Sequence, residues 1–274
     1  MTDRYAVIGN PVEHSKSPQI HAEFARQTGQ DISYERLSAP LDAFEVTVRK
    51  FFDEGGKGLN VTVPFKRGAW HMVNTHAGDA LDAEAVNTIK AEAGKLIGYN
   101  TDGTGLVNDL KKNIGIEIAG KRVLLLGTGG AAYGVMFPLL RENQALTLAY
   151  RTLEKAQRLV KTVENHQGVT GTGLKAKPYS GLAGEQFDIV INATSAGLSD
   201  EMPPLPPGIF ASGALAYDMV YGRDTPFMEF AREAGARAVD GLGMLVEQAA
   251  ESFFIWRGVR PDTASVIALL RGPR

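Results

Sequence analysis

The chain carries Arg122-Val123-Leu124-Leu125-Leu126-Gly127-Thr128-Gly129-Gly130-Ala131-Ala132 close to its midpoint. The apolar run before Gly127 is typical of a short buried strand, and the pattern of residues 133–141 predicts a helix. A strand, a G-x-G-x-x-A turn and a helix in this order form a dinucleotide-binding fingerprint. Gly127 allows the tight turn, Gly129 lets the backbone approach a pyrophosphate, and Ala132 permits close packing of the helix on the strand. The helix N-terminus then offers free N–H groups to phosphates. The alternative is a plain glycine-rich loop.

The residues around this motif predict two α/β domains. About 120 residues precede the motif, which is enough chain for a domain of its own. Alternating strand and helix signals there predict a mainly parallel sheet with helices on its faces, followed by a hairpin. The expected strands are residues 5–9, 33–37, 59–63, 86–90 and 95–99, and the expected helices are 17–27, 43–52 and 105–112.

A second strand and helix series begins at residue 121, and its order predicts a Rossmann-like domain. Its expected strands are 122–126, 145–150, 174–178, 187–192 and 214–219, and a long amphipathic helix follows at 242–256. We expect residues 1–103 and 240–274 to form an N-terminal α/β substrate-binding and catalytic domain, to which the C-terminal helices return. Residues 104–239 form the expected nucleotide-binding domain.

The composition excludes several classes of function. The formal net charge of −2 gives no basic field for nucleic acid or an anionic membrane, and no run approaches 18 apolar residues. The first residues carry no apolar signal core, and the absence of cysteine excludes disulfides and cysteine-ligated zinc. The five histidines form no metal-binding spacing. We therefore expect a cytoplasmic enzyme without a metal and without a nucleic-acid or membrane partner. We expect a monomer or homodimer that acts on a small molecule, although the composition determines neither property.

Polar residues gather where the first strands are expected to end. Asn60 and Thr62 are two residues apart, on one face near the C-terminal end of strand 59–63, and Lys66 follows shortly after. Ligands of open α/β sheets bind outside the carboxyl ends of the strands, so these side chains are candidates for a binding site. The alternative is a half-exposed edge strand and a solvated lysine.

Two further motifs have a structural and a functional interpretation. Ser17 before Pro18 is a good N-cap and N1 pair, yet the same loop follows the first strand and faces the same edge of the sheet. Asp102 can merely cap the helix that follows it, and an aspartate at a helix start is more often structural than catalytic.

Seven segments, in order and with matching spacing, resemble the shikimate dehydrogenase family over essentially the whole chain. They are His14-Ser15-Lys16-Ser17-Pro18, Asn60-Val61-Thr62-Val63-Pro64-Phe65-Lys66, Ala85-Val86-Asn87-Thr88, Asn100-Thr101-Asp102-Gly103, Asn192-Ala193-Thr194-Ser195-Ala196-Gly197, Tyr217-Asp218-Met219-Val220-Tyr221 and Asp240-Gly241-Leu242-Gly243-Met244-Leu245-Val246-Glu247-Gln248.

The resemblance implies reversible reduction of 3-dehydroshikimate to shikimate by NADPH, in aromatic amino-acid and chorismate biosynthesis. It implies that Ser15, Ser17 and Tyr221 hold the substrate carboxylate, and that Lys66 and Asp102 form the catalytic pair. The ring hydroxyls are then held by Asn60, Thr62, Asn87, Asp102 and Gln248. This interpretation requires the amine of Lys66 and the acid of Asp102 to converge, although they are some three dozen positions apart.

The cofactor is expected to be NADP. The second strand of the nucleotide domain ends at Tyr150, and Arg151 follows where NAD-binding proteins usually carry an acid for the ribose. Arg151, with Thr152 and Lys155, favours a 2′-phosphate, although Tyr150 replaces an asparagine common in the family and Glu154 lies close by. The other expected cofactor-binding residues are Gly127, Gly129, Gly130, Ala131, Ala193, Thr194, Ser195, Met219, Gly241 and Met244.

Two other functions compete with this one. A paralogous dehydrogenase would act on quinate or another cyclic polyol, with NADP or NAD. A nucleotide-binding regulatory module would have no turnover. Intact Lys66 and Asp102 argue against the module, and the paired serines with Tyr221 favour shikimate over quinate.

Overall fold

The computed structural model describes residues 2–143, 145–166, 173–194, 196 and 200–272. The chain divides into two compact units, which we call unit 1 (Met1–Gly105 with Leu245–Arg274) and unit 2 (Leu106–Met244). The sequence placed these boundaries at 103/104 and 239/240. The two crossings fall inside helices α5 (Asp102–Asn108) and α9 (Leu242–Arg257), so each helix contributes residues to both units.

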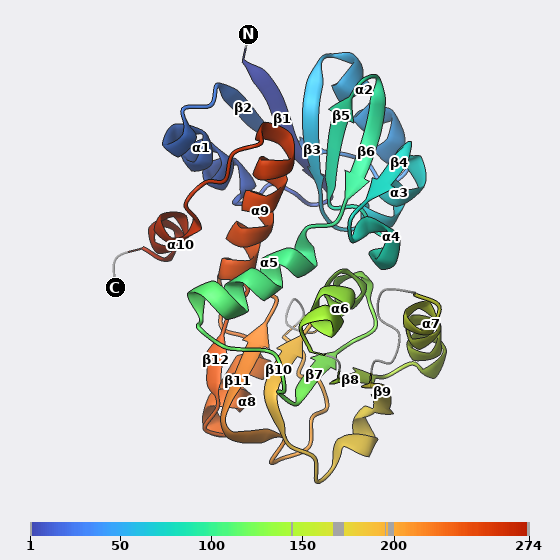
Figure 1. Ribbon diagram of the computed structural model, residues 1–274, viewed down its shortest axis with the longest axis vertical. Coiled ribbons are helices and arrows are strands. Elements are labelled where there is room, and N and C mark those ends of the chain that lie inside the picture. The colour runs from blue at the N-terminus through green and yellow to red at the C-terminus, as the bar shows by residue number, and fades with distance from the viewer. Residues whose placement is uncertain (1, 144, 167–172, 195, 197–199, 273–274) are drawn as a thin grey trace. The chain divides into compact units, whose positions relative to one another are not determined.

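Unit 1 contains a six-stranded mixed sheet in the order β2-β1-β3-β5-β6-β4 (Figure 1). Strands β1, β2 and β3 are parallel and β5 and β6 form an antiparallel hairpin, which confirms both predictions. The strands are β1 (Asp3–Gly9), β2 (Ile32–Ser38), β3 (Gly56–Val61), β4 (Thr75–Ala77), β5 (Thr88–Glu92) and β6 (Lys95–Tyr99).

Helices cover both faces of this sheet. Ala6 and Ile8 of β1 pack in a core with α2 and α3, whereas Tyr5 on the opposite face stacks on Trp256 of α9. A second core joins α1, α9 and α10. Burial on both faces explains why the first strand is a continuous apolar run. The helices are α1 (Ser17–Thr28), α2 (Phe44–Asp53), α3 (Lys66–Met72), α4 (Ala80–Ala83), α9 and α10 (Thr263–Arg271).

Two expected elements of this half of the chain differ in the structure. Strand β3 ends at Val61 rather than Val63, because the chain turns at residues 63–65 before α3. The helix expected at 105–112 begins earlier, as α5 at Asp102, and continues as a π-helix over Asp109–Asn113.

Unit 2 contains a six-stranded, wholly parallel sheet in the order β12-β11-β10-β7-β8-β9. This is the Rossmann-like arrangement that the sequence predicted. The strands are β7 (Val123–Leu126), β8 (Ala145–Tyr150), β9 (Gly173–Pro178), β10 (Phe187–Asn192), β11 (Phe210–Asp218) and β12 (Arg237–Val239). Helices α6 (Gly130–Glu142) and α7 (Leu153–Glu164) pack on one face, and α8 (Pro226–Glu233) with the 3-10 helix Tyr179–Leu182 packs on the other.

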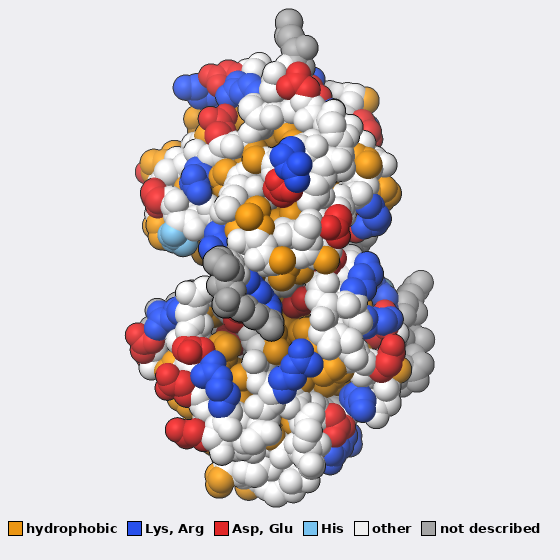
Figure 2. All heavy atoms as spheres, turned by 90° about the vertical axis from the view of Figure 1, so that its left-hand side faces the viewer, with side chains coloured by type: hydrophobic (Ala, Val, Ile, Leu, Met, Phe, Trp, Pro, Cys, Tyr) orange, Lys and Arg blue, Asp and Glu red, His pale blue; other side chains and the backbone are white. Residues whose placement is uncertain are grey.

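Acidic and basic side chains are interspersed over the visible face of each unit (Figure 2). Among the described residues, no helix is both long enough and apolar enough to span a bilayer.

His21 of α1 predicts an acid dependence of stability. The ring is fully buried and stacks on Tyr34 with 4.2 Å between centroids, and burial lowers the pKa of His21 to about 3. Because the folded pKa lies below the unfolded value, the stability present above pH 6.5 is lost as pH falls toward 3. We expect the free energy of unfolding to fall by about 2 kcal/mol from pH 7 to pH 5 through this group alone.

Urea unfolding checks this expectation, with the fluorescence of Trp70 and Trp256 reporting on unit 1. The His21→Phe variant should lose this part of the slope between pH 7 and pH 5. Substitution of the exposed His14 by Asn should keep it. Equal slopes in the two variants would contradict the assignment to His21.

Candidate functional site

In unit 1, the polar residues predicted for a substrate lie at one edge of the sheet. Strands β1, β3 and β6 run in the same direction, and the segments after them carry Ser15 and Ser17, Lys66, and Asp102 respectively. Strand β5 runs the opposite way, so Asn87, just before it, starts at this same edge. The topology therefore gathers residues that are far apart in the sequence.

Lys66 and Asp102 are in direct contact at this edge. The Lys66 Nζ donates to Asp102 Oδ2 at 2.6 Å, which confirms that the two side chains converge. The Asp102 side chain is 9% exposed, whereas that of Lys66 is 26% exposed. The carboxylate is thus fixed inside the protein while the ammonium stays accessible from outside.

Asn87 holds the other oxygen of this carboxylate. Its Nδ2 donates to Asp102 Oδ1 at 2.8 Å and its backbone N–H donates to the Tyr99 carbonyl. The Asn87 Oδ1 in turn accepts from the Thr101 N–H at 2.9 Å. Because the Val86 N–H donates to the Lys66 carbonyl at 2.9 Å, the same segment also fixes the start of α3. Asn87 is 2% exposed, so it orients the ion pair from inside the protein.

Buried hydroxyl and amide groups extend this network to helix α9. Ser252 lies within 2.7 Å of the Thr88 hydroxyl, accepts from Asn60 Nδ2 at 3.0 Å and donates to the Gln248 carbonyl at 3.0 Å. Gln248 Oε1 accepts from the Thr101 hydroxyl at 3.3 Å. The sequence did not single out Ser252, because a serine within an apolar helix gives no pattern that distinguishes it.

The side-chain amide of Asn60 is engaged within the protein. Its two N–H groups face three acceptors, which are the Asn87 carbonyl, the Thr88 hydroxyl and the Ser252 hydroxyl. Its Oδ1 accepts from the Tyr34 hydroxyl at 2.7 Å. Burial raises the pKa of Tyr34 well above 10, with the neighbouring Ser17 side chain acting in the opposite direction, so the tyrosine remains a donor.

The expectation that Ser17 caps α1 is wrong. Lys16 occupies the N-cap position, no side chain caps the helix, and Ser17 is its first residue. The Ser15 hydroxyl donates to Ser17 Oγ at 3.2 Å and accepts from the Ser17 N–H at 3.3 Å. Since neither hydroxyl is used as a cap, the pair stays available for a ligand.

Thr62 lies just beyond β3, with its backbone N–H bonded to the Ile8 carbonyl at 2.9 Å. Its hydroxyl makes no hydrogen bond to the described residues. A Cβ on Gly9 would come within 2.5 Å of the Thr62 methyl group, so only glycine at the end of β1 leaves room for this side chain. Gly9 was not identified from the sequence.

In unit 2, the glycine turn follows β7 where the sheet reverses its strand order, with β8 on one side of β7 and β10 on the other. Gly127 has a φ of 101°, and a Cβ there would come within 2.9 Å of the Thr194 methyl group. A Cβ on Gly129 or Gly130 would contact nothing within 4 Å. Helix α6 begins at Gly130 with no capping side chain and no acid in its first turn, whereas Ala132 is fully buried. This open cradle fits a dinucleotide phosphate.

The loops after β10 and β11 face the same edge. Asn192 Oδ1 accepts from the Thr194 N–H at 3.1 Å, and its Nδ2 donates to Asp218. Gly241 packs on Met219, where a Cβ would lie 2.4 Å from the carbonyl oxygen. Ala193 is buried at the end of β10, while Ser195 lies outside the described residues.

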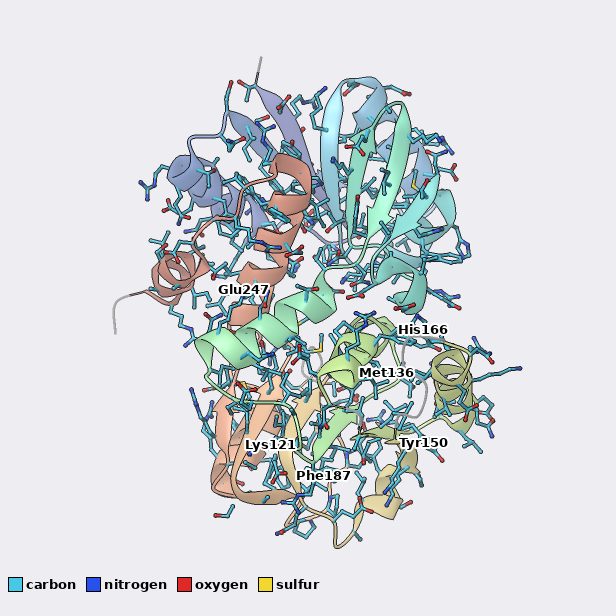
Figure 3. All side chains as sticks on the ribbon, in the orientation of Figure 1. Lys121, Met136, Tyr150, His166, Phe187 and Glu247 are labelled. Atoms are coloured by element: carbon cyan, nitrogen blue, oxygen red, sulfur yellow. The ribbon has the colours of Figure 1, made fainter. Side chains whose placement is uncertain are left out.

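The residues expected near the adenosine end lie after β8. Arg151 is 64% exposed and its nearest acid is Glu201 at 3.9 Å. Tyr150 is half-buried at the end of β8 (Figure 3), and Thr152 is the N-cap residue of α7 without a side-chain capping bond. Lys155 is exposed in the first turn of the same helix. The exposed guanidinium is therefore available for a phosphate.

Three more predicted residues belong to unit 2. Tyr221 is half-buried in unit 2, and burial raises the pKa of its hydroxyl. Met244 is 7% exposed in the core of unit 2, and Ala131 is half-buried in the first turn of α6.

The described residues contain no cluster of His, Asp and Glu that could hold a metal.

A parallel sheet with a glycine turn, together with a polar edge that holds a lysine–carboxylate pair, defines the class of dinucleotide-dependent oxidoreductases. Comparisons with known proteins specify the class. The profile described as shikimate dehydrogenase substrate binding domain matches residues 7–89, and the shikimate 5′-dehydrogenase C-terminal domain matches residues 241–271. The chain is 57% identical to the shikimate dehydrogenase (NADP(+)) of Alkalilimnicola ehrlichii, over 99% of both chains.

Solved structures agree with this result. An Ael1 enzyme from Pseudomonas putida is 45% identical, with a TM-score of 0.92 over 99% of both chains. Shikimate 5-dehydrogenase from Thermus thermophilus, in complex with NADP(H) and shikimate, is 32% identical with a TM-score of 0.86, over 98% of this chain and 99% of that one. The chain belongs to the shikimate dehydrogenase family.

Gly127→Ala should weaken dinucleotide binding. The change strains a backbone with positive φ by about 1–2 kcal/mol and drives a methyl group into Thr194. We expect at least a tenfold rise in Kd for NADPH, measured by isothermal titration. Gly120→Ala is the matched control, because Gly120 has a φ of 72° and its Cβ would contact nothing within 4 Å. Equal affinities for the two variants would contradict a steric role for Gly127.

Proposed function

We propose that this protein is a shikimate dehydrogenase, which catalyses the reversible reduction of 3-dehydroshikimate to shikimate with NADPH. The observation that carries the proposal is the Lys66–Asp102 pair at 2.6 Å, oriented by Asn87 on the same sheet edge as Ser15 and Ser17. Membership of the family, at 57% identity over the whole chain, supports the assignment.

The polar edge of unit 1 suits a polyhydroxylated carboxylate. Ser15 and Ser17 offer two hydroxyls and the uncapped start of α1 to the carboxylate, and Tyr221 of unit 2 is proposed to assist them. Thr62 and Gln248 are proposed to offer hydrogen bonds to ring hydroxyls. Asn87 is 2% exposed and its amide hydrogens face three acceptors within the protein, so its proposed contribution is to orient Asp102. An unmet polar group in such a site would cost about 1–3 kcal/mol, so each of these contacts favours the matching ring.

Lys66 is proposed as the general acid of reduction and the general base of oxidation. When bound, the cofactor supplies the hydride to the carbonyl carbon. Lys66 Nζ donates a proton to the carbonyl oxygen as that oxygen becomes a hydroxyl. Asp102 holds the ammonium in place, and its carboxylate accepts a hydrogen bond from a neighbouring ring hydroxyl. The Lys66 side chain is 26% exposed, so its amine can then exchange its proton with solvent.

The residues of unit 2 fit NADP. The open turn at Gly129 and Gly130 and the uncapped start of α6 would hold the pyrophosphate, and Ala193 and Thr194 would contact the nicotinamide ribose with their backbone. Arg151, Thr152 and Lys155 would hold the 2′-phosphate. Met219, Gly241 and Met244 are proposed to line the nicotinamide end. The relatives named for NADP(+) support this choice.

We further infer a cytoplasmic enzyme, monomeric or homodimeric, with substrates of the shikimate pathway. A chain without cysteine needs no oxidising compartment. A quinate dehydrogenase with the same fold is the alternative, because one ring hydroxyl is a small difference in such a site.

One assay tests the function and the cofactor together. Initial rates are measured with shikimate or quinate, each with NADP or NAD. We expect shikimate with NADP to give the highest kcat/KM, because the exposed Arg151 guanidinium, whose contact with Glu201 among the described residues is a long one at 3.9 Å, favours a 2′-phosphate. Higher kcat/KM with quinate would assign the paralogous function, and a clear preference for NAD would overturn the role of Arg151.

Lys66→Ala should lower kcat by about 10²–10⁴-fold and change KM for shikimate much less, because proton transfer acts in the transition state. Steady-state kinetics with saturating NADP measures both constants. Lys57→Ala is the control, since Lys57 is an exposed lysine of β3. A kcat near that of the native enzyme would remove Lys66 from the catalytic role.

A further inference from the structure

Arg36 of β2 makes a two-pronged contact with the serine loop. Its Nε and Nη2 donate to the backbone carbonyl oxygen of Ser15 at 3.1 and 2.6 Å. Hydrogen bonds from a charged donor are roughly twice as strong as neutral ones, and two of them from one planar group restrict the acceptor's position. An exposed side chain on an edge strand is therefore tied to the loop between β1 and α1.

The position of Arg36 in the sheet explains why it reaches this loop. Tyr34 and Arg36 are two residues apart, so they lie on the same face of β2, and Tyr34 stacks on His21 of α1 on that face. Tyr34 donates to Asn60, whereas Arg36, closer to the end of β2, reaches Ser15. The same face of β2 therefore carries both side chains, one of which contacts Asn60 and the other Ser15.

The charge of Arg36 is not neutralised by its surroundings. No carboxylate of the described residues forms an ion pair with it. Glu35, its neighbour on the other face, pairs with Arg4 at 3.0 Å. Glu13 of the serine loop accepts from the Val12 N–H at 3.0 Å, and backbone hydrogen bonds lower its pKa. Lys16 and His14 of the same loop are further groups that are neutral or positive.

We propose that Arg36 is a positioning residue for the substrate carboxylate. It holds the Ser15 carbonyl so that the hydroxyls of Ser15 and Ser17 lie together, and it adds a positive charge beside the substrate carboxylate, whose other proposed partners, Ser15, Ser17 and Tyr221, are neutral hydroxyls. This inference rests on the proposed function, since it requires a carboxylate substrate at the serine pair.

Arg36→Gln and Arg36→Lys test the two parts of this role. Arg36→Gln removes both the positive charge and the paired N–H donors, whereas Arg36→Lys keeps the charge and loses the paired donors. We expect KM for shikimate to rise at least tenfold in Arg36→Gln and less in Arg36→Lys, with kcat within threefold and KM for NADP unchanged. The neutral methyl ester of shikimate supplies the decisive comparison. It lacks the charge that Arg36 complements, so its kcat/KM should fall less in Arg36→Gln than that of shikimate.

Arg49→Gln is the control, since Arg49 is a 59% exposed arginine that pairs with Glu45 within α2. It should leave all constants unchanged. A KM for shikimate within twofold of the native value in Arg36→Gln would overturn the proposal, as would equal losses for shikimate and its methyl ester. Absence of turnover by the native enzyme with shikimate would instead overturn the proposed function.

Discussion

The bond between the Lys66 ammonium and the Asp102 carboxylate is the interaction on which the site depends. A partly buried carboxylate is costly to leave unpaired, and here both oxygens are satisfied, one by Lys66 and the other by Asn87. Lys66 follows β3, Asn87 precedes β5 and Asp102 follows β6, so the three residues come from different connections of the same sheet. The ion pair therefore ties the start of α3 to the start of α5, and a displacement of either helix would separate the charges.

The reversal of strand direction in unit 1 makes this arrangement possible. In a purely parallel sheet, all the segments that precede strands lie at one end of the sheet, and all the segments that follow strands lie at the other end. Because β5 runs antiparallel to β3 and β6, the residue before β5 and the residues after β6 reach the edge where β1 and β3 end. Asn87 and Asp102 thereby join Ser15 and Lys66. Unit 2 has a wholly parallel sheet whose strand order reverses at β7. Ligands of such sheets bind outside the carboxyl ends of the strands at this point of reversal.

Much of this could be predicted from local patterns, and the rest depends on contacts that no local pattern contains. Apolar runs and the glycine turn located the main strands, whereas Lys66 and Asp102 were paired only through the resemblance of their motifs to the shikimate dehydrogenase family. Ser17 was misassigned because Ser-Pro is a common helix start, whereas the helix begins one residue earlier than capping requires. Tyr34 and Arg36 are alternating residues of an edge strand, and only the tertiary structure shows that they reach Asn60 and Ser15.

The roles of Asn60 and Thr62 are separated by their surroundings rather than by their type. Asn60 is 6% exposed and its amide hydrogens already have more acceptors than they can serve, so it has no donor left for a ring hydroxyl. Its amide instead holds the Asn87 carbonyl and the Thr88 hydroxyl. The Thr62 hydroxyl lies past the end of β3 and makes no hydrogen bond to the described residues. Two polar residues of one motif thus differ in their surroundings, since the Asn60 amide is bonded within the protein and the Thr62 hydroxyl makes no hydrogen bond to the described residues.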